Sequence, residues 1–314
     1  MKNIIFALFV TFVLLGCSHT KQPVASINDM PLTSYVNPFI GTGGHGHTYP
    51  GATAPFGMVQ LSPDTRLDGW DGCSGYHYSD NYIYGFSHTH LSGTGVSDYG
   101  DILLMPTGSI NFNNGANGKK GYGSSFSHQK EEASPGFYKV HLEDTNIDVA
   151  LTTTTRAAMH SYSYPSAENQ VLILDLLHRD KVLDASIEII SDTEIQGFRF
   201  SEAWATDQRL FFNIKTSHPF TDMLQSPPKK GMPGARKCAL EFKNPNNEPV
   251  YISVGISAVD QAGAKLNREV EIGSKTFETL KREATQSWEQ QLEKIVVQDP
   301  NTDHLATFYT ALYH

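Results

Sequence analysis

The chain has 314 residues, a formal net charge of −9 at pH 7 and only 3 cysteines. This length is enough for one large β unit or for two domains with a substantial core. The acidic balance argues against nucleic acid as a partner, because phosphate backbones are bound by clustered lysine and arginine side chains.

The N-terminus has the features of a targeting segment. Lys2 provides a short cationic start, residues 4–15 are predominantly apolar, and Leu14-Leu15-Gly16-Cys17 follows. The apolar stretch is too short to span a bilayer as a stable helix. Its ending resembles a bacterial lipobox, which predicts lipidation at Cys17. An ordinary cleaved signal peptide is the alternative, and both predict export.

Residues 18–33 are polar and contain proline, so we interpret them as a tether between the membrane and the folded part of the chain. Two cysteines remain beyond the tether, Cys73 and Cys238. An oxidising compartment permits a disulfide between them. A single pair in a chain of this length does not indicate a disulfide framework, and the pairing stays open.

Residues 37–101 differ in composition from the rest of the chain. They hold 13 of the 26 glycines in about a fifth of the length, with one cation, Arg66, and neither lysine nor glutamate. Glycine at this density indicates close-approaching backbone rather than regular elements. The polar side chains of the stretch are five histidines and six aspartates, interleaved with aromatic residues: His45, His47, His77, His88, His90, Asp64, Asp68, Asp71, Asp80, Asp98 and Asp101.

This composition predicts one wall of a binding pocket, since polar and aromatic side chains on loops are where ligands usually bind. A phosphorylated ligand would be repelled by the local negative charge. A neutral ligand rich in hydroxyl groups fits better, because aspartate and histidine bond hydroxyls and aromatic faces cover the CH groups of a sugar.

Short β segments dominate the middle of the chain. Alternating or β-rich patterns separated by turn residues predict an antiparallel sandwich, and the absence of helix-length segments between them argues against a βαβ sheet. The fold class is therefore mainly β, a large antiparallel β-sandwich. The predicted strands are residues 58–61, 102–105, 137–142, 147–152, 159–164, 171–174, 193–200, 210–214 and 251–256, while 111–127 and 217–236 are predicted loops.

The periodicity becomes helical near residue 274. Phe277, Leu280, Ala284, Trp288, Leu292 and Ile295 fall on one face and predict an amphipathic helix of about five turns. Thr302 resembles an N-cap of a second helix, whose apolar stripe is Leu305, Phe308, Tyr309 and Leu312. No helix stop signal follows before His314, so we expect this stripe to be unmatched and a further domain to be missing.

Two motifs within the glycine-rich stretch suggest ligands that we weigh against simpler interpretations. Residues 41–46 match G-x-G-x-x-G, but Pro38 precedes them and prolines follow, so the strand and helix of a dinucleotide site are not expected. The pairs His45–His47 and His88–His90 are compatible with zinc. Histidines that bond hydroxyls or hold loops, and purely structural histidines, are the favoured alternatives.

Trp70 lies between carboxylates in turn-forming sequence, where it is either a sugar platform or an ordinary packing residue. Glycoside hydrolysis needs two carboxylates, and the aspartates of the stretch include candidates for such a pair. Aspartates in glycine-rich turns usually bond their own backbone instead, which we favour here. The stretch contains no nucleophile elbow and no P-loop.

Four long motifs resemble the N-terminal part of glycoside hydrolase family 92, the bacterial exo-acting α-mannosidases that process N-glycans and mannans. They span residues 36–52, 69–76, 86–93 and 308–314, and include Asn37-Pro38-Phe39-Ile40-Gly41-Thr42-Gly43-Gly44-His45-Gly46-His47 and Gly69-Trp70-Asp71-Gly72-Cys73. The resemblance implies an N-terminal β-sandwich, linking helices and an (α/α)6 catalytic barrel.

In this family, the resemblance implies a calcium-dependent, inverting mechanism whose general acid, general base and calcium ligands lie in the barrel. No catalytic residue and no metal ligand is therefore expected in this chain. The expected contacts to a mannose-containing glycan are Gly43, Gly44, His45, Trp70 and Asp71, with His88 and His90 as weaker choices. The expected partner of this surface is the missing catalytic domain.

The resulting division is a signal peptide at 1–17, the tether at 18–33, the sandwich at 34–272, a linker helix at 273–300 and the start of the barrel at 301–314. The protein would then be an exported bacterial lipoprotein of the periplasm or cell surface, inactive alone. Two other functions stay open: a surface lipoprotein that only binds glycans, and a zinc hydrolase that uses the histidine pairs.

Overall fold

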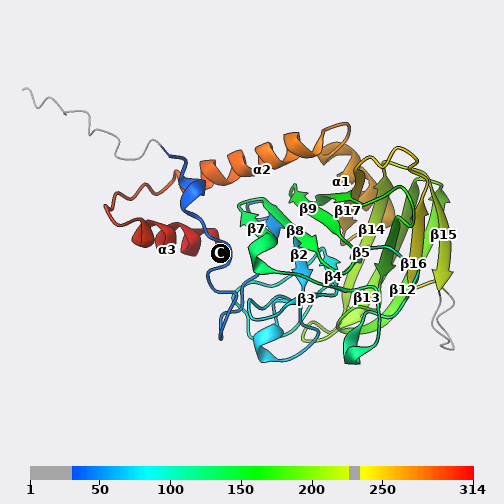
Figure 1. Ribbon diagram of the computed structural model, residues 1–314. Coiled ribbons are helices and arrows are strands. Elements are labelled where there is room, and N and C mark those ends of the chain that lie inside the picture. Colours follow the sequence, from blue (N-terminus) through cyan, green and yellow to red (C-terminus); the bar gives the residue numbers. More distant parts are fainter. Residues whose placement is uncertain (1–29, 226–233) are drawn as a thin grey trace, which may run out of the picture.

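The structure is a computed structural model that describes residues 30–225 and 234–314. Two antiparallel sheets pack face to face, and three α-helices follow them in the chain (Figure 1). The predicted fold class, a large antiparallel β-sandwich followed by helices, is confirmed. Each predicted strand overlaps an observed one, because the alternating or continuous apolar patterns correspond to strands with one or both faces buried.

The first sheet has seven strands in the order β1-β2-β4-β5-β11-β16-β15. Its central strands β5 and β11 are buried along their whole length. The strands are β1 (Ala52–Thr53), β2 (Gln60–Asp64), β4 (Gly85–Ser87), β5 (Leu103–Thr107), β11 (Val171–Asp175), β16 (Lys237–Phe242) and β15 (Phe220–Gln225).

The second sheet has eight strands in the order β12-β13-β14-β17-β10-β9-β8-β7. These strands are β12 (Lys181–Ser191), β13 (Glu194–Glu202), β14 (Gln208–Thr216), β17 (Val250–Ser257), β10 (Ala157–Ser163), β9 (Ile147–Thr153), β8 (Phe137–Leu142) and β7 (Glu131–Ser134). A two-stranded sheet pairs β3 (Tyr82–Ile83) with β6 (Ser124–Ser125). The short 3-10 helices are η1 (Leu32–Tyr35), η2 (Trp70–Gly72), η3 (Ala116–Gly118) and η4 (His128–Lys130).

The main core lies between the two large sheets. Alternate residues of the second sheet, such as Val149, Leu151 and Ile252, point into it and join the apolar side chains of β5 and β11. On the opposite face of the second sheet, Phe137 and Met159 form a smaller cluster with the helices. Strands of the second sheet therefore bury apolar side chains on both faces, one against the first sheet and the other against the helices.

Two predicted loops contain more structure than expected. Residues 217–236 include β15, which pairs with β16 at the edge of the first sheet, so the loop prediction is wrong for that part. Residues 111–127 include η3 and β6, and Tyr122 is buried with its hydroxyl donating to Asp175 Oδ2 at 2.8 Å. This segment is anchored to β11 rather than being a simple surface loop.

A chain of neutral histidines joins the two sheets through the core. The hydroxyl of Tyr162 donates to Nδ1 of His160 at 2.8 Å, and Nε2 of His160 lies 3.0 Å from Nε2 of His88. Nδ1 of His88 lies 2.7 Å from the carbonyl oxygen of Ile102, which can only accept. Every bond of this chain is satisfied when both imidazoles are neutral and His160 donates to His88.

Burial lowers the pKa of His88 to about 4 and the pKa of His160 well below its ordinary value, because neither ring can be hydrated when charged. A proton added to Nε2 of His88 would face the N–H of His160 across the 3.0 Å contact, and a proton added to Nδ1 of His160 would occupy the position that accepts from Tyr162. This part of the core is therefore stable only with both histidines neutral.

Three α-helices follow the strands. α1 (Gln261–Glu271) lies against β17 and β14. It lies within the range assigned to the sandwich alone, and sequence analysis did not predict it. α2 (Phe277–Leu292) buries Phe277, Leu280, Ala284, Trp288 and Leu292 as predicted, but it ends before Ile295, which is exposed. Figure 1 shows α2 extending from α1 to the end of the molecule that holds α3.

α3 (Thr302–Tyr313) is capped by Asn301, whose side chain accepts from the amide of Asp303, one residue earlier than predicted. Its apolar stripe is not unmatched. Leu305 and Tyr309 are buried against η1 and α2, and only Leu312 of the predicted stripe is exposed. Thr310 Oγ1 also accepts from the amide of Asn37 at 2.9 Å, which fixes the start of the glycine-rich stretch on this helix.

We predict that the stability of the sandwich falls as the pH drops from 7 towards 4.5, because the unfolded chain protonates its histidines near pH 6.5 while His88 and His160 stay neutral. The fall of the His88 pKa to about 4 corresponds to about 3 kcal/mol in the free energy of unfolding. Urea denaturation across this pH range measures the slope, which should become shallower in His160→Gln.

His141→Gln is the matched control, since His141 is partly exposed and pairs with Asp148 on the outer face of the sheet. The slope of this variant should equal that of the parent. A His160→Gln slope as steep as the parent's would contradict the assignment of neutral core histidines.

Candidate functional site

Three segments of the glycine-rich stretch come together on one surface, residues 41–48, 69–73 and 93–97. The amide of Gly93 donates to the carbonyl oxygen of His47 at 2.7 Å, and the thiol of Cys73 donates to the carbonyl oxygen of Thr94 at 2.8 Å. Each of the other two segments is thus bonded to residues 93–97. We call these three segments the rim.

Two positions of the rim have room only for glycine, because the backbone there contacts another backbone segment or the indole ring of Trp70. A Cβ on Gly46 would lie 2.1 Å from the carbonyl oxygen of Gly41, and a Cβ on Gly95 would lie 2.2 Å from Cη2 of Trp70. No side chain fits at either position without moving its neighbour. The first contact closes residues 41–48 into a tight loop, and the second brings residues 93–97 directly against the indole.

Trp70 begins η2, after Gly69 with a φ of 87°. The indole is 63% exposed although Gly95 lies against its ring. The imidazole of His47 meets it edge-on, with ring centroids 5.0 Å apart and an interplanar angle of 81°. The tryptophan is therefore held in place while most of its surface stays open to a ligand.

Asp71 carries the charge of the rim. Its Oδ1 lies 2.8 Å from Nδ1 of His45 and 3.9 Å from Nε2 of His47. The hydrogen bond from His45 holds the pKa of Asp71 below its usual range, so the carboxylate is ionised at neutral pH. An ionised carboxylate beside two imidazoles and an indole presents acceptors, donors and an apolar face to a polyhydroxylated ligand.

The structure places Gly43, Gly44, His45, Trp70 and Asp71 together in the rim, as the pocket-wall hypothesis requires. A Cβ on Gly44 would have no atom within 4 Å, so the space over this glycine is open. Sequence analysis did not single out His77, whose Nε2 lies 3.0 Å from the carbonyl oxygen of Gly44 and supports the loop from below.

The two weaker choices lie inside the fold. His88 belongs to the core chain that joins the sheets, and His90 is buried with Nδ1 2.8 Å from the carbonyl oxygen of Gln60. Neither imidazole faces the surface on which Trp70 and Asp71 lie exposed. Any effect of these histidines on a sugar would be transmitted through the loops that they hold.

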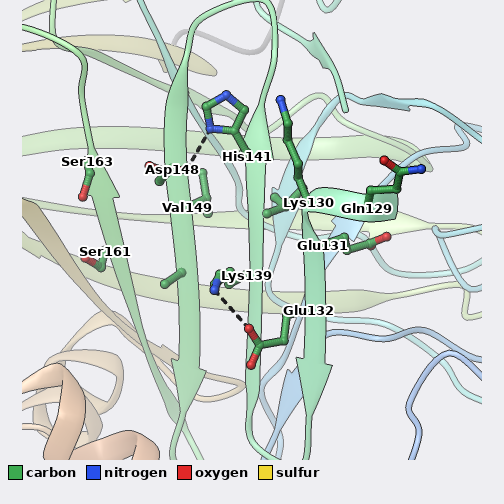
Figure 2. A pocket seen from close by; sticks show the side chains of 12 residues that line it. Gln129, Lys130, Glu131, Glu132, Lys139, His141, Asp148, Val149, Ser161 and Ser163 are labelled. Carbon is green, nitrogen blue, oxygen red and sulfur yellow. Dashed lines mark hydrogen bonds and ion pairs between the residues drawn. The ribbon is translucent and has the colours of Figure 1, made fainter. Parts of the chain in front are cut away.

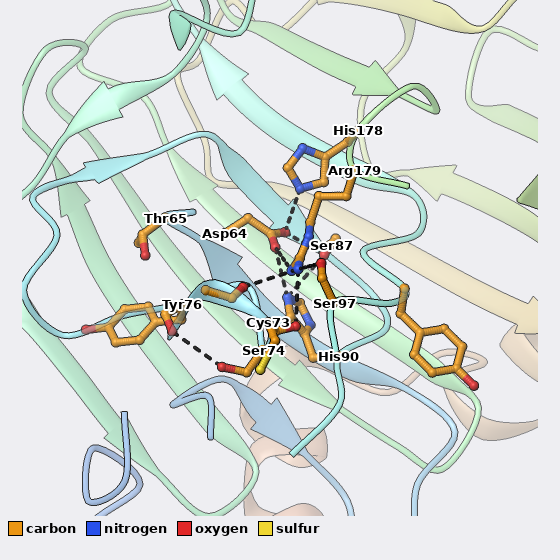
Figure 3. Close-up of polar contacts among 12 residues, drawn as sticks. Asp64, Thr65, Cys73, Ser74, Tyr76, Ser87, His90, Ser97, His178 and Arg179 are labelled. Atoms are coloured by element: carbon orange, nitrogen blue, oxygen red, sulfur yellow. Dashed lines mark hydrogen bonds and ion pairs between the residues drawn. The ribbon is translucent and has the colours of Figure 1, made fainter. Parts of the chain in front are cut away.

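A buried charged cluster lies beneath the rim (Figure 3). Asp64 is fully buried, with Oδ1 3.2 Å from Nε2 of His90 and 3.7 Å from Nη1 of Arg179, and with Oδ2 3.3 Å from Nε2 of His178. The hydroxyl of Ser87 donates to Oδ2 at 2.5 Å. Burial disfavours the charged carboxylate, but the charges and hydrogen bonds of His178 and His90 outweigh it and hold the pKa of Asp64 well below its usual range.

Other aspartates of the stretch are also occupied. Asp101 is buried and accepts from Arg199, Thr89 and Gln208. Asp98 is buried and accepts from the amide of Ala205 at 2.9 Å. The favoured interpretation, that turn aspartates bond their own backbone, holds for Asp98, which also accepts from the amide of Tyr99, but not for Asp101, whose partners are side chains distant in sequence or on other elements. These two carboxylates do not form an exposed acid–base pair.

The two histidine pairs do not meet, since His45 and His47 lie in the rim and His88 and His90 lie in the interior. Among residues 30–225 and 234–314, no group of three or more His, Cys, Asp or Glu side chains could hold a metal ion. The zinc hypothesis therefore receives no support from the geometry. Cys73 and Cys238 are both free and buried, so the disulfide left open by the sequence is absent.

A groove of about 440 Å³ on the outer face of the second sheet is a separate candidate (Figure 2). Its charged side chains are already paired: Nζ of Lys139 lies 3.0 Å from Oε2 of Glu132, and Nδ1 of His141 lies 2.8 Å from Oδ1 of Asp148. No buried aspartate or exposed indole lines it. The rim offers the more specific set of ligand-binding groups.

In the part of the chain that the structure describes, no helix is both long and apolar enough to cross a membrane. Cys17, the predicted lipidation site, lies outside the described residues, as do the signal peptide and most of the tether.

Comparison with known proteins identifies relatives of this architecture. Residues 35–257 match the N-terminal domain of glycosyl hydrolase family 92, and residues 262–314 match the catalytic domain of the same family. A relative described as an uncharacterized secreted glycosidase, from Arthroderma benhamiae, is 25% identical over 333 residues, covering 92% of this chain and 42% of the relative.

Two solved structures from Bacteroides thetaiotaomicron are similar as well. The family GH92 α-mannosidase BT3965 is 32% identical with a TM-score of 0.81, covering 91% of this chain and 41% of that protein. The family GH92 inverting mannosidase BT2199 is 26% identical with a TM-score of 0.78, covering 92% of this chain and 40% of that protein. The chain thus spans about two fifths of the length of these relatives, and it belongs to glycosyl hydrolase family 92.

Proposed function

We propose that this chain supplies one wall of the mannose-binding pocket of an inverting exo-α-mannosidase that acts on N-glycans or mannans. The observation that carries the proposal is the convergence of Trp70, Asp71 and His45 on one exposed surface. The indole face suits the CH groups of a pyranose, and the carboxylate and imidazole suit its hydroxyls. BT2199 is described as an inverting mannosidase, and a structure of BT3965 in complex with mannoimidazole has been solved. Both observations support a sugar as the ligand.

We propose further that the chain does not hydrolyse glycosides alone. An inverting enzyme needs two carboxyl groups about 6.5–9.5 Å apart with a water between them. Asp71 is the charged group of the rim, and Asp64, Asp98 and Asp101 are buried and bonded to other groups. The general acid and base are expected in the catalytic domain of a full-length family 92 enzyme.

Calcium is expected to belong to the same catalytic domain. The described residues do not fit a calcium site, because hard cations need several converging oxygen ligands and the buried carboxylates are bonded to cationic or hydrogen-bonding side chains instead. We also propose export as a lipoprotein anchored through Cys17 in the periplasm or at the cell surface, in keeping with the secreted fungal relative.

Trp70→Ala should weaken the binding of mannose or α-1,2-mannobiose by about tenfold or more, equivalent to about 1.4 kcal/mol, because the apolar face of the sugar loses its platform. Isothermal titration of the parent and the variant measures the change. Trp204→Ala is the matched control, since Trp204 is also an exposed tryptophan (76%) but lies outside the rim. Equal losses in both variants would contradict the rim as the sugar site.

The 314-residue chain incubated with α-1,2-mannobiose and calcium should release no mannose above the blank, because the acid–base pair is absent from the rim. Release of mannose is followed by chromatography. Robust hydrolysis would show that our placement of the catalytic groups is wrong. A different result is that the chain binds the sugar and releases no mannose even after a catalytic domain of the family is added. That result would favour a glycan-binding lipoprotein.

A further inference from the structure

Arg179 connects the two parts of the rim that hold Trp70. It lies between β11 and β12, far along the chain from the rim, and its side chain is buried. Its Nη2 donates to the carbonyl oxygens of Gly72 at 3.2 Å and Cys73 at 3.1 Å, and to the hydroxyl of Ser97 at 2.5 Å. One guanidinium thus bonds residues 72–73 at the end of η2 and Ser97, two residues after the Gly95 that contacts the indole; Figure 3 shows Arg179 beside Cys73 and Ser97.

Two glycines leave the space that this side chain occupies. A Cβ on Gly100 would lie 2.9 Å from Cδ of Arg179, and a Cβ on Gly75 would lie 2.7 Å from Nη1 and 2.5 Å from Oδ1 of Asp64. Asp64, 3.7 Å from Nη1, supplies the compensating negative charge. The surroundings are therefore fitted to a guanidinium at this place, in both shape and charge.

A second buried arginine fixes the backbone that carries Arg179. Arg199, on β13, donates through Nη2 to the carbonyl oxygens of His178 at 2.8 Å and Arg179 at 2.9 Å, and through Nε to that of Leu176 at 3.1 Å. Its charge is paired with Asp101. The side chain of Arg199 therefore spans from the second sheet to the loop that carries Arg179.

This loop adopts a conformation that needs such support. Arg179 and Asp180 have φ values of 48° and 47°, in the left-handed region that residues with a side chain rarely occupy. Strained backbone of this kind persists only where the surroundings over-determine it, and it is concentrated at functional sites. The bonds from Arg199 to three carbonyl oxygens provide that restraint.

We propose that Arg179 is the positioning residue of the rim, which sets the place of Trp70 and Asp71 relative to residues 93–97, and that Arg199 fixes Arg179 in turn. The consequence for sugar binding rests on the proposed function, while the positioning itself does not. A lysine at 179 keeps the charge, but its single nitrogen cannot lie beside Asp64, as Nη1 does, and also bond the two carbonyl oxygens and Ser97, as Nη2 does. A residue that only neutralised Asp64 would tolerate that exchange.

Arg179→Lys is tested by 19F NMR of the 314-residue chain labelled with 5-fluorotryptophan, with resonances assigned through Trp70→Phe and Trp204→Phe. We expect the Trp70 resonance to shift or broaden while that of the buried Trp288 is unchanged, and the affinity for α-1,2-mannobiose to fall about tenfold. Arg209→Lys is the matched control, because Arg209 is an exposed arginine paired with Asp207, and it should leave both readouts unchanged.

An unchanged Trp70 resonance in Arg179→Lys would overturn the proposal. If the Trp288 resonance is lost as well, Arg179→Lys is unfolded, and Ser97→Ala becomes the test of the proposal. This variant removes only the hydrogen bond from Arg179 Nη2 to Ser97 Oγ (2.5 Å). It should still shift the Trp70 resonance. A Trp70 resonance that does not move in Ser97→Ala would then overturn the proposal. If the parent chain binds no mannobiose, the proposed sugar site fails, while the resonance still tests the positioning.

Discussion

The exposed rim depends on an ion pair that is out of contact with water. Arg199 and Asp101 are both fully buried, and such a pair is tolerated only when every remaining donor and acceptor is bonded. Here the guanidinium bonds four further groups, and the carboxylate also accepts from Thr89 and Gln208. Replacing one partner would leave the other charged and unpaired in the core. The pair therefore fixes the junction between the sandwich and the loops above it.

A rim built in this way differs from a set of flexible surface loops. Some of its glycines have no room for a side chain because a neighbouring atom occupies the place of the missing Cβ, as at Gly95 and Gly46. Its polar support comes from Arg179 and His77, while Trp70 and Asp71 contact imidazoles of the rim itself and stay accessible. A preorganised surface of this type loses little conformational entropy when a sugar binds.

Sequence patterns were sufficient for the sandwich and for part of the rim. Alternation predicted strands such as β8 and β9, the glycine-rich composition predicted a pocket wall, and the resemblance to family 92 selected Trp70, Asp71 and His45 within it. The His-x-His motif could not distinguish His45 from His88, because the same motif occurs both in an exposed loop and in the buried core. α1 was missed because its buried face consists of Ala264 and Arg268 while Leu266 and Val270 are exposed, which reverses the expected amphipathic stripe. Arg179 carried no local signal, since its partners are about a hundred residues away.

The same separation explains why a binding surface and a catalytic pair need not lie on one domain. Buried cations beneath the rim, Arg179 and Arg199, require nearby carboxylates, and Asp64 and Asp101 are committed to them. A carboxylate that neutralises a buried guanidinium is held ionised and inaccessible, so it cannot donate a proton to a leaving group. The charges beneath the rim thus exclude Asp64 and Asp101 from acid catalysis, whereas Asp71 lies in the rim and is bonded to His45.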